Sequence, residues 1–142
     1  FAVVSHLARA GERYVNVDDY SGLGARSPLL AATLTVFLLS LIGIPVTAGF
    51  FAKFYVFSAA LQANLVGLVI IGVINSAVAS YYYLRVVVVM YMRDAREPVP
   101  ISPVPTTLGV ALAISAIATI YLGVLPARVL DYAARTSAAW LH

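Results

Sequence analysis

The sequence predicts an all-α membrane protein with three complete transmembrane helices and the end of a preceding one. Of its 142 residues, 62% are hydrophobic and 11% are charged, whereas a soluble domain carries about a quarter charged residues. Residues 27–52, 54–84 and 98–127 contain no Asp, Glu, Lys or Arg. Each of these runs exceeds the roughly 20 residues that a helix needs to cross a bilayer. Helices satisfy their own backbone hydrogen bonds in lipid, so the runs predict membrane helices.

The composition argues against several classes of function. The net charge of +3 comes from scattered basic residues, and without a Lys/Arg cluster it does not indicate nucleic-acid binding. The chain has no cysteine, which excludes disulfides, iron–sulfur clusters and thiolate metal sites within it. His6 and His142 stand near opposite ends of the sequence, and no spacing of side chains predicts a metal site.

Residues 1–8 are expected to be the end of a membrane helix that begins upstream. They are mostly apolar and start with Phe rather than Met. They have neither the basic n-region nor the cleavage site of a signal peptide. We therefore expect the chain to be the C-terminal piece of a longer protein. Residues 9–28, which are rich in charged residues and glycine, are expected to be a polar connection.

The first complete membrane helix is predicted over residues 28–62, with Ser27 as its N-cap and Pro28 at its first position. A straight helix of this length would measure about 51 Å, against roughly 30 Å of hydrocarbon. We expect a break near Gly43–Gly49, because Pro45 removes an amide donor and clashes with the preceding turn. The break either lines a wet cavity or is a simple proline kink packed on its neighbours.

Lys53 is the only charged residue between Arg26 and Arg85. It lies nine residues before Gln62, about 13 Å inside the outer boundary and near the bilayer midplane. A charge at this depth is costly and normally marks an ion or proton route, and burial favours the neutral form of a lysine. The alternative is a structural ion pair. Because the membrane spans hold no carboxylate, either role predicts a partner from outside this chain.

The second membrane helix is predicted over residues 64–92. Small and hydroxyl-bearing residues follow one face of it: Gly72, Ser76, Ser80 and Tyr83. Such a stripe is typical of close helix packing, and a hydroxyl-lined water path is the alternative. Asn75 lies beside the stripe and needs a hydrogen-bond partner. Arg85 lies about 10 Å from the interface, so snorkelling or a structural ion pair is favoured over catalysis. Secondary candidates for a site are Asn75, Ser76, Tyr83 and Arg85.

Residues 93–105 are predicted to be a loop because they contain four closely spaced prolines. A third membrane helix is predicted over 106–126, and an interfacial tail over 127–142. The arginines of the two large loops are Arg9, Arg13, Arg26, Arg93 and Arg96, against Arg128 and Arg135 on the opposite side. This excess predicts that loops 9–28 and 93–105 are cytoplasmic and that the C-terminus is outside.

Three motifs resemble one family. The segment LLSLIGIPVTAGFFAKFY at 38–55 resembles the broken-helix motif of the antiporter-like subunits of respiratory complex I. The segments DYSGL at 19–23 and RSP at 26–28 fit the loop before that helix. The segment YYYLRVV at 81–87 is similar to the following helix of subunit N, the smallest of these subunits. The motifs occur in the family's order and cover about residues 1–95, so the resemblance is specific.

The resemblance implies a fourteen-helix subunit of which this chain supplies the end of helix 11 and helices 12 to 14. Lys53 matches the ionisable position on the family's broken helix, near the outward proton half-channel. Gly43, Pro45 and Gly49 would supply the break that admits water. The related subunit M has a glutamate in place of the lysine, so Lys53 favours subunit N. The family's other proton-route residues lie upstream of Phe1.

The implied function is that of a membrane subunit of a proton-translocating NADH:quinone oxidoreductase that carries part of the proton path. Flavin, iron–sulfur clusters, NADH and quinone would belong to the whole complex, with no cofactor, metal or redox centre in this chain. The expected partners are other complex I membrane subunits, including neighbouring antiporter-like ones, in a bacterial plasma membrane. The alternatives are a subunit of a multisubunit sodium/proton antiporter and a purely structural membrane anchor.

Overall fold

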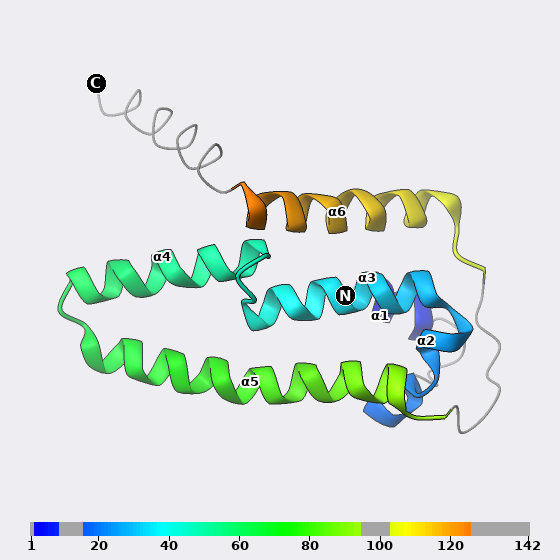
Figure 1. The fold of residues 1–142 in the computed structure, drawn as a ribbon, viewed down its shortest axis with the longest axis horizontal. Helices are drawn as coiled ribbons and strands as arrows, with labels where there is room; N and C mark the ends of the chain where they lie inside the picture. Colours follow the sequence, from blue (N-terminus) through cyan, green and yellow to red (C-terminus); the bar gives the residue numbers. More distant parts are fainter. Residues whose placement is uncertain (1, 9–15, 95–102, 126–142) are drawn as a thin grey trace.

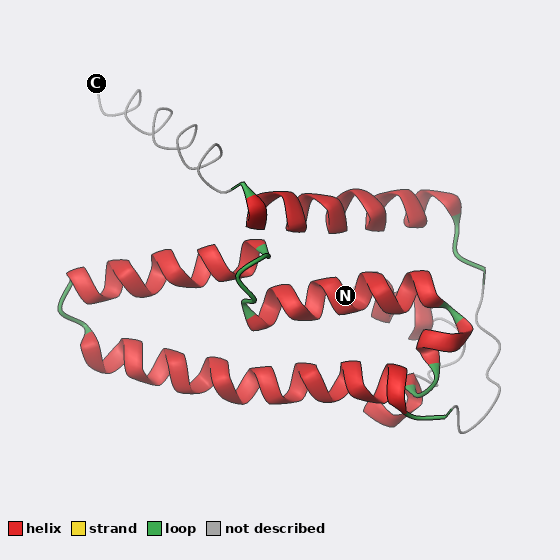
Figure 2. Ribbon diagram, in the orientation of Figure 1, coloured by secondary structure: helices red, strands yellow, loops and turns green. Residues whose placement is uncertain are grey.

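The computed structural model describes residues 2–8, 16–94 and 103–125. Every regular element within these ranges is a helix, and none is a strand (Figure 2). In chain order they are α1 (Ala2–Ala8), η1 (Val17–Tyr20), α2 (Leu23–Arg26), α3 (Pro28–Ile42), α4 (Ala48–Gln62), α5 (Val66–Met92) and α6 (Thr106–Val124). The fold is therefore all-α over the part of the chain that the structure describes, as the sequence predicts.

Two helices among the described residues are long and apolar enough to cross a membrane unaided. They are α5, with 27 residues, and α6, with 19. The helices α3 and α4 have 15 residues each, or about 22 Å, which is less than the roughly 30 Å of hydrocarbon. Figure 1 shows α3 and α4 following one another along the length of α5, with both in contact with it. Two half-helices together thus match the length of one continuous helix.

The described part of the polar connection before α3, residues 16–27, contains helical structure that the sequence did not predict. It contains the short helices η1 and α2, and the Asn16 amide donates to the Asp19 carboxylate at the start of η1 (2.7 Å). At the same end of the molecule, the Arg93 guanidinium donates to the Asp18 carboxylate (2.7 Å). These contacts tie the connection to the end of α5. Residues 9–15, 95–102 and 126–142, which include parts of both predicted loops and the predicted interfacial tail, lie outside the described residues.

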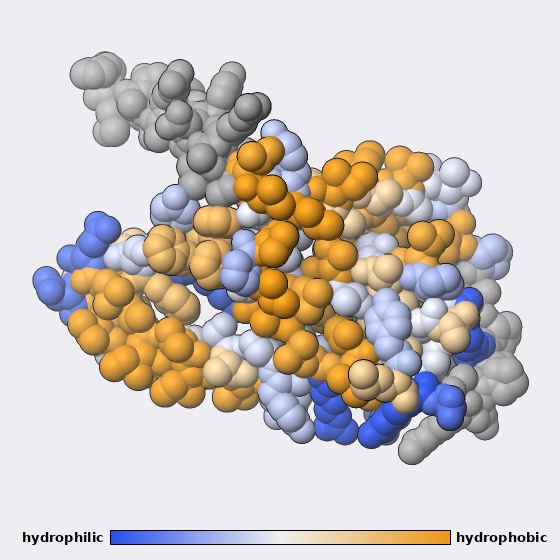
Figure 3. Space-filling model, in the orientation of Figure 1, coloured by the Kyte–Doolittle hydropathy of each residue, from blue (hydrophilic) through white to orange (hydrophobic). Residues whose placement is uncertain are grey.

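The buried core gathers where α1, η1, α2, α3 and the end of α5 meet, with one member from α6. Its members are Val3, Leu7, Tyr20, Leu23, Leu30, Ala31, Leu34, Leu38, Met90 and Leu112. In contrast, α4 has no buried residue, and most of α5 presents exposed apolar side chains. Figure 3 shows an apolar middle between a polar end with the short helices and a polar tip where α4 turns into α5. This pattern suits a surface that faces lipid or further protein.

The helix boundaries differ slightly from those drawn from the sequence. The second membrane helix begins at Val66 rather than at 64, and α6 ends at Val124 rather than at 126. Helix ends commonly vary by one or two residues between criteria. The predicted helix over 28–62 is split in two, since α3 ends at Ile42 and α4 begins at Ala48.

Candidate functional site

The interruption between α3 and α4 begins with a left-handed glycine. Gly43 has φ +91° and ψ 46°, a conformation that L side chains rarely adopt. Its amide donates to the carbonyls of Leu39 and Ser40 (both 3.1 Å), and the Ile44 amide donates to the Leu39 carbonyl (3.2 Å). This is the hydrogen-bonding pattern of a glycine helix terminus. It stops α3 sharply in the middle of an apolar sequence.

A compact turn carries the chain from α3 into α4. Pro45 lies in this turn and is exposed. Thr47 closes the turn by donating its amide (2.9 Å) and its hydroxyl (2.8 Å) to the Ile44 carbonyl. The Thr47 side chain is buried, and its extended backbone precedes the first residue of α4. The polar groups of the irregular segment are therefore largely satisfied, as the interior of a membrane protein requires.

Two glycines allow close approach around the turn. A Cβ on Gly49 would overlap the carbonyl of Ser40, so the first turn of α4 presses directly on the last turn of α3. The Gly49 amide also donates to the Ser40 hydroxyl (3.2 Å). A Cβ on Gly123 would overlap the backbone at Val46 and Thr47, so α6 packs against the turn. At the turn, the backbone of α4 therefore lies directly against that of α3, and the backbone of α6 lies directly against the turn itself.

Lys53 reaches back from α4 to the end of α3. Its ammonium donates to the carbonyls of Leu41 (2.8 Å) and Ile42 (3.0 Å), and to the hydroxyl of Ser76 on α5 (2.7 Å). An ammonium has three donor hydrogens, and this site supplies three acceptors. Both carbonyls lie in the last turn of α3, where no intrahelical donor exists. The negative end of the helix dipole lies there as well and favours a positive charge.

The structure gives Lys53 three hydrogen-bond acceptors within the chain, and the expected partner from outside the chain stays a prediction. The hydrogen-bonding capacity of Lys53 is filled by oxygen atoms of the described residues. The expectation looked for a carboxylate, and the helices α3 to α6 contain none. It overlooked that breaking a helix frees carbonyl oxygens at that depth. The C-terminus of α3 thus supplies acceptors for the ammonium without an acidic side chain.

The other predicted site residues differ in where they lie relative to Lys53. Among the secondary candidates, Ser76 is the one that accepts a hydrogen bond from Lys53. Ser80 donates its hydroxyl to the Ser76 carbonyl (2.8 Å). Asn75 is exposed, and Tyr83 is half-buried and packs on the core. Gly72 lies against the Phe57 ring, where a Cβ would come within 2.9 Å of a ring carbon, so the stripe serves packing at that point.

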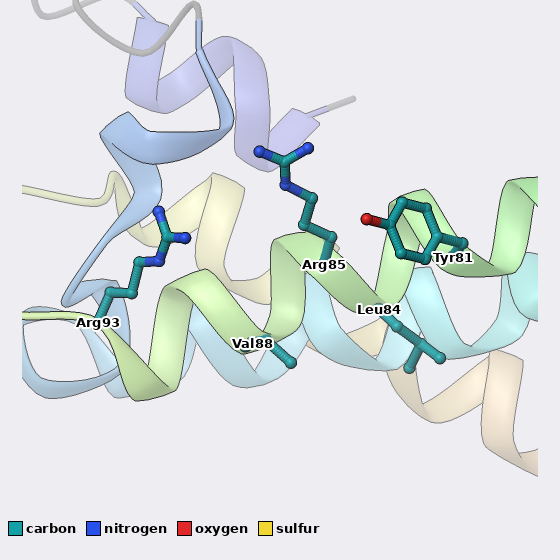
Figure 4. A pocket seen from close by; sticks show the side chains of 5 residues that line it. All are labelled: Tyr81, Leu84, Arg85, Val88 and Arg93. Atoms are coloured by element: carbon teal, nitrogen blue, oxygen red, sulfur yellow. The ribbon is translucent and has the colours of Figure 1, made fainter.

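Arg85 lies away from Lys53, nine residues beyond Ser76 or about 13 Å along α5. It is exposed and lines a shallow cavity with Tyr81, Leu84, Val88 and Arg93. Figure 4 shows the Arg85 and Arg93 side chains extending from the same side of α5. The described residues contain no group of three or more His, Asp or Glu side chains placed to hold a metal ion.

Sequence reasoning missed four residues that contribute to this site. The Leu41 and Ile42 carbonyls carry no side-chain signal, because every residue has a carbonyl. Ser40 was overlooked because a lone serine in an apolar helix is unremarkable. Gly123 lies far along the chain from the break, and only the packing of α6 against the turn reveals its role.

Comparison with known proteins defines the class of this chain. Residues 1–79 match the model of the NADH:quinone oxidoreductase/Mrp antiporter transmembrane family. This match covers more than half of the 142 residues, and it includes α3, α4 and Lys53. The chain therefore belongs to this family. Together with the apolar helices, the match identifies an integral membrane protein.

Individual relatives indicate which subunit within the family this chain resembles. The chain is 66% identical over 135 residues to NADH-quinone oxidoreductase subunit N 2 of Koribacter versatilis, covering 95% of this chain and 27% of that protein. It is 49% identical over 139 residues to subunit N 1 of Solibacter usitatus, covering 97% and 29%. The chain thus spans little more than a quarter of the length of these curated relatives. The resemblance to the antiporter-like subunits of complex I, and to subunit N among them, is confirmed.

A solved structure agrees with the sequence relatives. The described fold resembles a chain of respiratory complex I from Thermus thermophilus with bound aureothin, with a TM-score of 0.74 and 33% identity. The match covers 82% of this chain and 27% of that one. At this identity and TM-score, the likeness supports the same overall arrangement of helices over the matched part of both proteins.

Proposed function

We propose that this chain is part of a membrane subunit of a proton-translocating NADH:quinone oxidoreductase and carries one end of its proton path. The observation that carries the proposal is the ammonium of Lys53, held by three oxygens at a helix break in an apolar span. A lysine in a membrane helix is a proton carrier far more readily than an arginine, because it can lose its proton. The relatives named as subunit N support the same assignment.

In this function, Lys53 accepts a proton from a polar axis formed by the rest of the subunit and later releases it outward. The Leu41 and Ile42 carbonyls and the Ser76 hydroxyl stabilise the protonated state. A second cation arriving nearby disfavours the ammonium and promotes loss of its proton. The break formed by Gly43, Pro45 and Gly49 gives water access to this point. This chain's residues hold and release a proton, and redox chemistry belongs to other subunits with flavin, iron–sulfur clusters, NADH and quinone.

The proposal includes the arrangement in the membrane. The pair α3 and α4, then α5 and α6, form three complete spans of a fourteen-helix subunit, with α1 as the end of the helix before them. The loops 9–28 and 93–105 are cytoplasmic and the C-terminus is outside, as the arginine distribution favours. The partners are other complex I membrane subunits, including neighbouring antiporter-like ones, in a bacterial plasma membrane.

A sodium/proton antiporter subunit is the second candidate, because the matching family model covers both classes. The named relatives favour the oxidoreductase. Purification of the full-length protein from its native membrane decides between them. Co-purification with flavin and iron–sulfur subunits is expected. Isolation with antiporter subunits alone would overturn the assignment.

The experiment that tests the site replaces Lys53 in the full-length subunit within the whole complex. Lys53→Met is expected to assemble and to lower the number of protons translocated per NADH oxidised in reconstituted vesicles. Arg85→Met is the matched control, because it removes the other cation of the membrane helices from an exposed position near a helix end. It is expected to leave this ratio unchanged. A full ratio in assembled Lys53→Met would show that Lys53 is only structural.

A further inference from the structure

The three acceptors around Lys53 are chemically unequal. The carbonyls of Leu41 and Ile42 can only accept a hydrogen bond, whereas the Ser76 hydroxyl can accept one and donate one. The distance from the Lys53 ammonium to the Ser76 oxygen is 2.7 Å, the shortest of the three. Ser76 is therefore the one group among these acceptors that can respond when the lysine changes its protonation state.

Loss of a proton changes what the lysine requires. The ammonium has three donor hydrogens and no lone pair, while the neutral amine has two hydrogens and one lone pair that needs a donor. The two carbonyls cannot supply that donor. Lys53 is half-buried, and a lone pair that has no donor is unfavourable where water is excluded, so a site made only of carbonyls would oppose deprotonation. A hydroxyl that turns its hydrogen toward nitrogen removes this cost.

We propose that Ser76 is a positioning residue whose hydroxyl accepts from the protonated Lys53 and donates to the neutral Lys53. The side chain of Lys53 then keeps its place at the break in both states. This inference rests on the proposed function, because it assumes that Lys53 exchanges a proton. No bond to Ser76 is made or broken, since only the direction of one hydrogen bond reverses.

The packing around Ser76 fits this role. Ser76 lies on the continuous helix α5, whereas Lys53 and its carbonyl acceptors lie on the two half-helices. Phe57 lies one turn beyond Lys53 on α4, and Gly72 lies one turn before Ser76 on α5. The Phe57 ring packs against Gly72, where a Cβ would come to 2.9 Å from a ring carbon. This contact fixes the separation of α4 and α5 beside the site. The Lys53–Ser76 distance is thereby held by packing as well as by the hydrogen bond.

Ser80 offers a matched control on the same helix. It lies one turn beyond Ser76, is half-buried in the same way, and donates its hydroxyl to a carbonyl of its own helix, that of Ser76 (2.8 Å). Serine hydroxyls commonly bond the backbone four residues back in membrane helices. Removing the Ser80 hydroxyl thus tests the loss of a serine from α5 without removing a group that contacts Lys53.

The test uses the full subunit within the whole complex, reconstituted into vesicles, with Ser76→Ala, Ser76→Thr, Ser80→Ala and Lys53→Met compared in parallel. NADH oxidation with an artificial electron acceptor and the amount of assembled subunit report on integrity. Proton uptake reports on transport. Ser76→Ala is expected to slow proton translocation about tenfold, as loss of a hydrogen bond to a charged group implies. Ser76→Thr, which keeps the hydroxyl, and Ser80→Ala are expected to remain within about twofold of the unaltered protein.

The outcomes separate the inference from the function on which it rests. If Lys53→Met translocates fewer protons while assembled Ser76→Ala translocates at the normal rate, Ser76 does not position Lys53 and the proposed function stands. If Ser76→Thr is as slow as Ser76→Ala, the site needs a small side chain and not a hydroxyl, which overturns the inference. If Lys53→Met itself translocates normally, the proposed function fails first.

Discussion

The interrupted pair α3 and α4 and the continuous helix α5 extend over similar lengths of the molecule. They differ in whether their backbone carbonyls are hydrogen-bonded within a helix. In α5, 27 residues form one helix whose middle has no unsatisfied carbonyl. Between α3 and α4, Gly43 is the C-cap of one helix and Thr47 the N-cap of the next, and the Leu41 and Ile42 carbonyls accept from Lys53 instead of from a helix amide. The comparison teaches that a helix break creates a cation site in an apolar span without any acidic side chain.

The largest expected effect comes from filling the space between the half-helices. Gly49→Val would make side-chain atoms overlap the carbonyl group of Ser40. This carbonyl belongs to the backbone and cannot move aside without shifting α3. We expect a loss of about 3 kcal/mol or more, in the range of severe overpacking, and failure of the subunit to assemble. The amount of subunit in the purified complex measures this.

The continuous helix provides the control for that substitution. Gly67 of α5 has no atom within 4 Å of the position of a Cβ, so Gly67→Val is expected to assemble normally. Equal assembly of the two variants would contradict the close approach of α3 and α4.

A smaller effect is expected where α6 packs on the turn. Gly123→Ala brings a methyl group into the backbone at Val46 and Thr47, and relief requires α6 to move away. We expect a loss of about 1–3 kcal/mol and a lower thermal unfolding midpoint of the purified complex. Gly109→Ala, on the same helix with only a side-chain atom 3.9 Å away, is the matched control. A midpoint lowered equally by both would remove the special role of Gly123.

Substitution of the left-handed glycine Gly43 is expected to cause an intermediate loss of stability. Gly43→Ala puts a side chain at φ +91° and brings its Cβ to 3.3 Å from Cδ of Lys53. The backbone strain alone costs about 1–2 kcal/mol. Gly43→Asn, which tolerates this conformation better, is expected to lose less stability than Gly43→Ala in the same thermal measurement. The reverse order would argue against a left-handed helix terminus.

The smallest effect is expected at the polar end of the molecule. Arg93→Met removes the ion pair with Asp18, in which the two side chains are 52% and 39% exposed. Exposed ion pairs contribute about 0–1 kcal/mol, so thermal stability should change little. A loss comparable to that of Gly123→Ala would show that the contact between η1 and α5 matters more than its exposure implies.

Much of the fold could be predicted from the sequence, because its causes are local. The uncharged runs predict the apolar helices α3 to α6, and the excess length of 28–62 together with Pro45 predicts the break. The short helices η1 and α2 could not be predicted in the same way. Glycine, serine and charged residues dominate the sequence of these two short helices. Their helical conformation depends on packing against α5 and α3.

The candidate site could be predicted only in part. Lys53 stands out because a single charge in an apolar run is rare. Its acceptors do not stand out, since two are backbone carbonyls and the third, Ser76, lies in a stripe that fits helix packing equally well. Only the spatial meeting of α3, α4 and α5 distinguishes Ser76 from Ser80.

The most direct test of the central claim is the proton-to-NADH ratio of the complex carrying Lys53→Arg. Arginine keeps a positive charge and several donors for the carbonyls at the end of α3, but it does not release its proton. If Lys53 exchanges a proton at the break, the assembled variant will translocate fewer protons per NADH, as Lys53→Met does. A normal ratio would contradict the account, because it would show that a fixed charge at the break is sufficient.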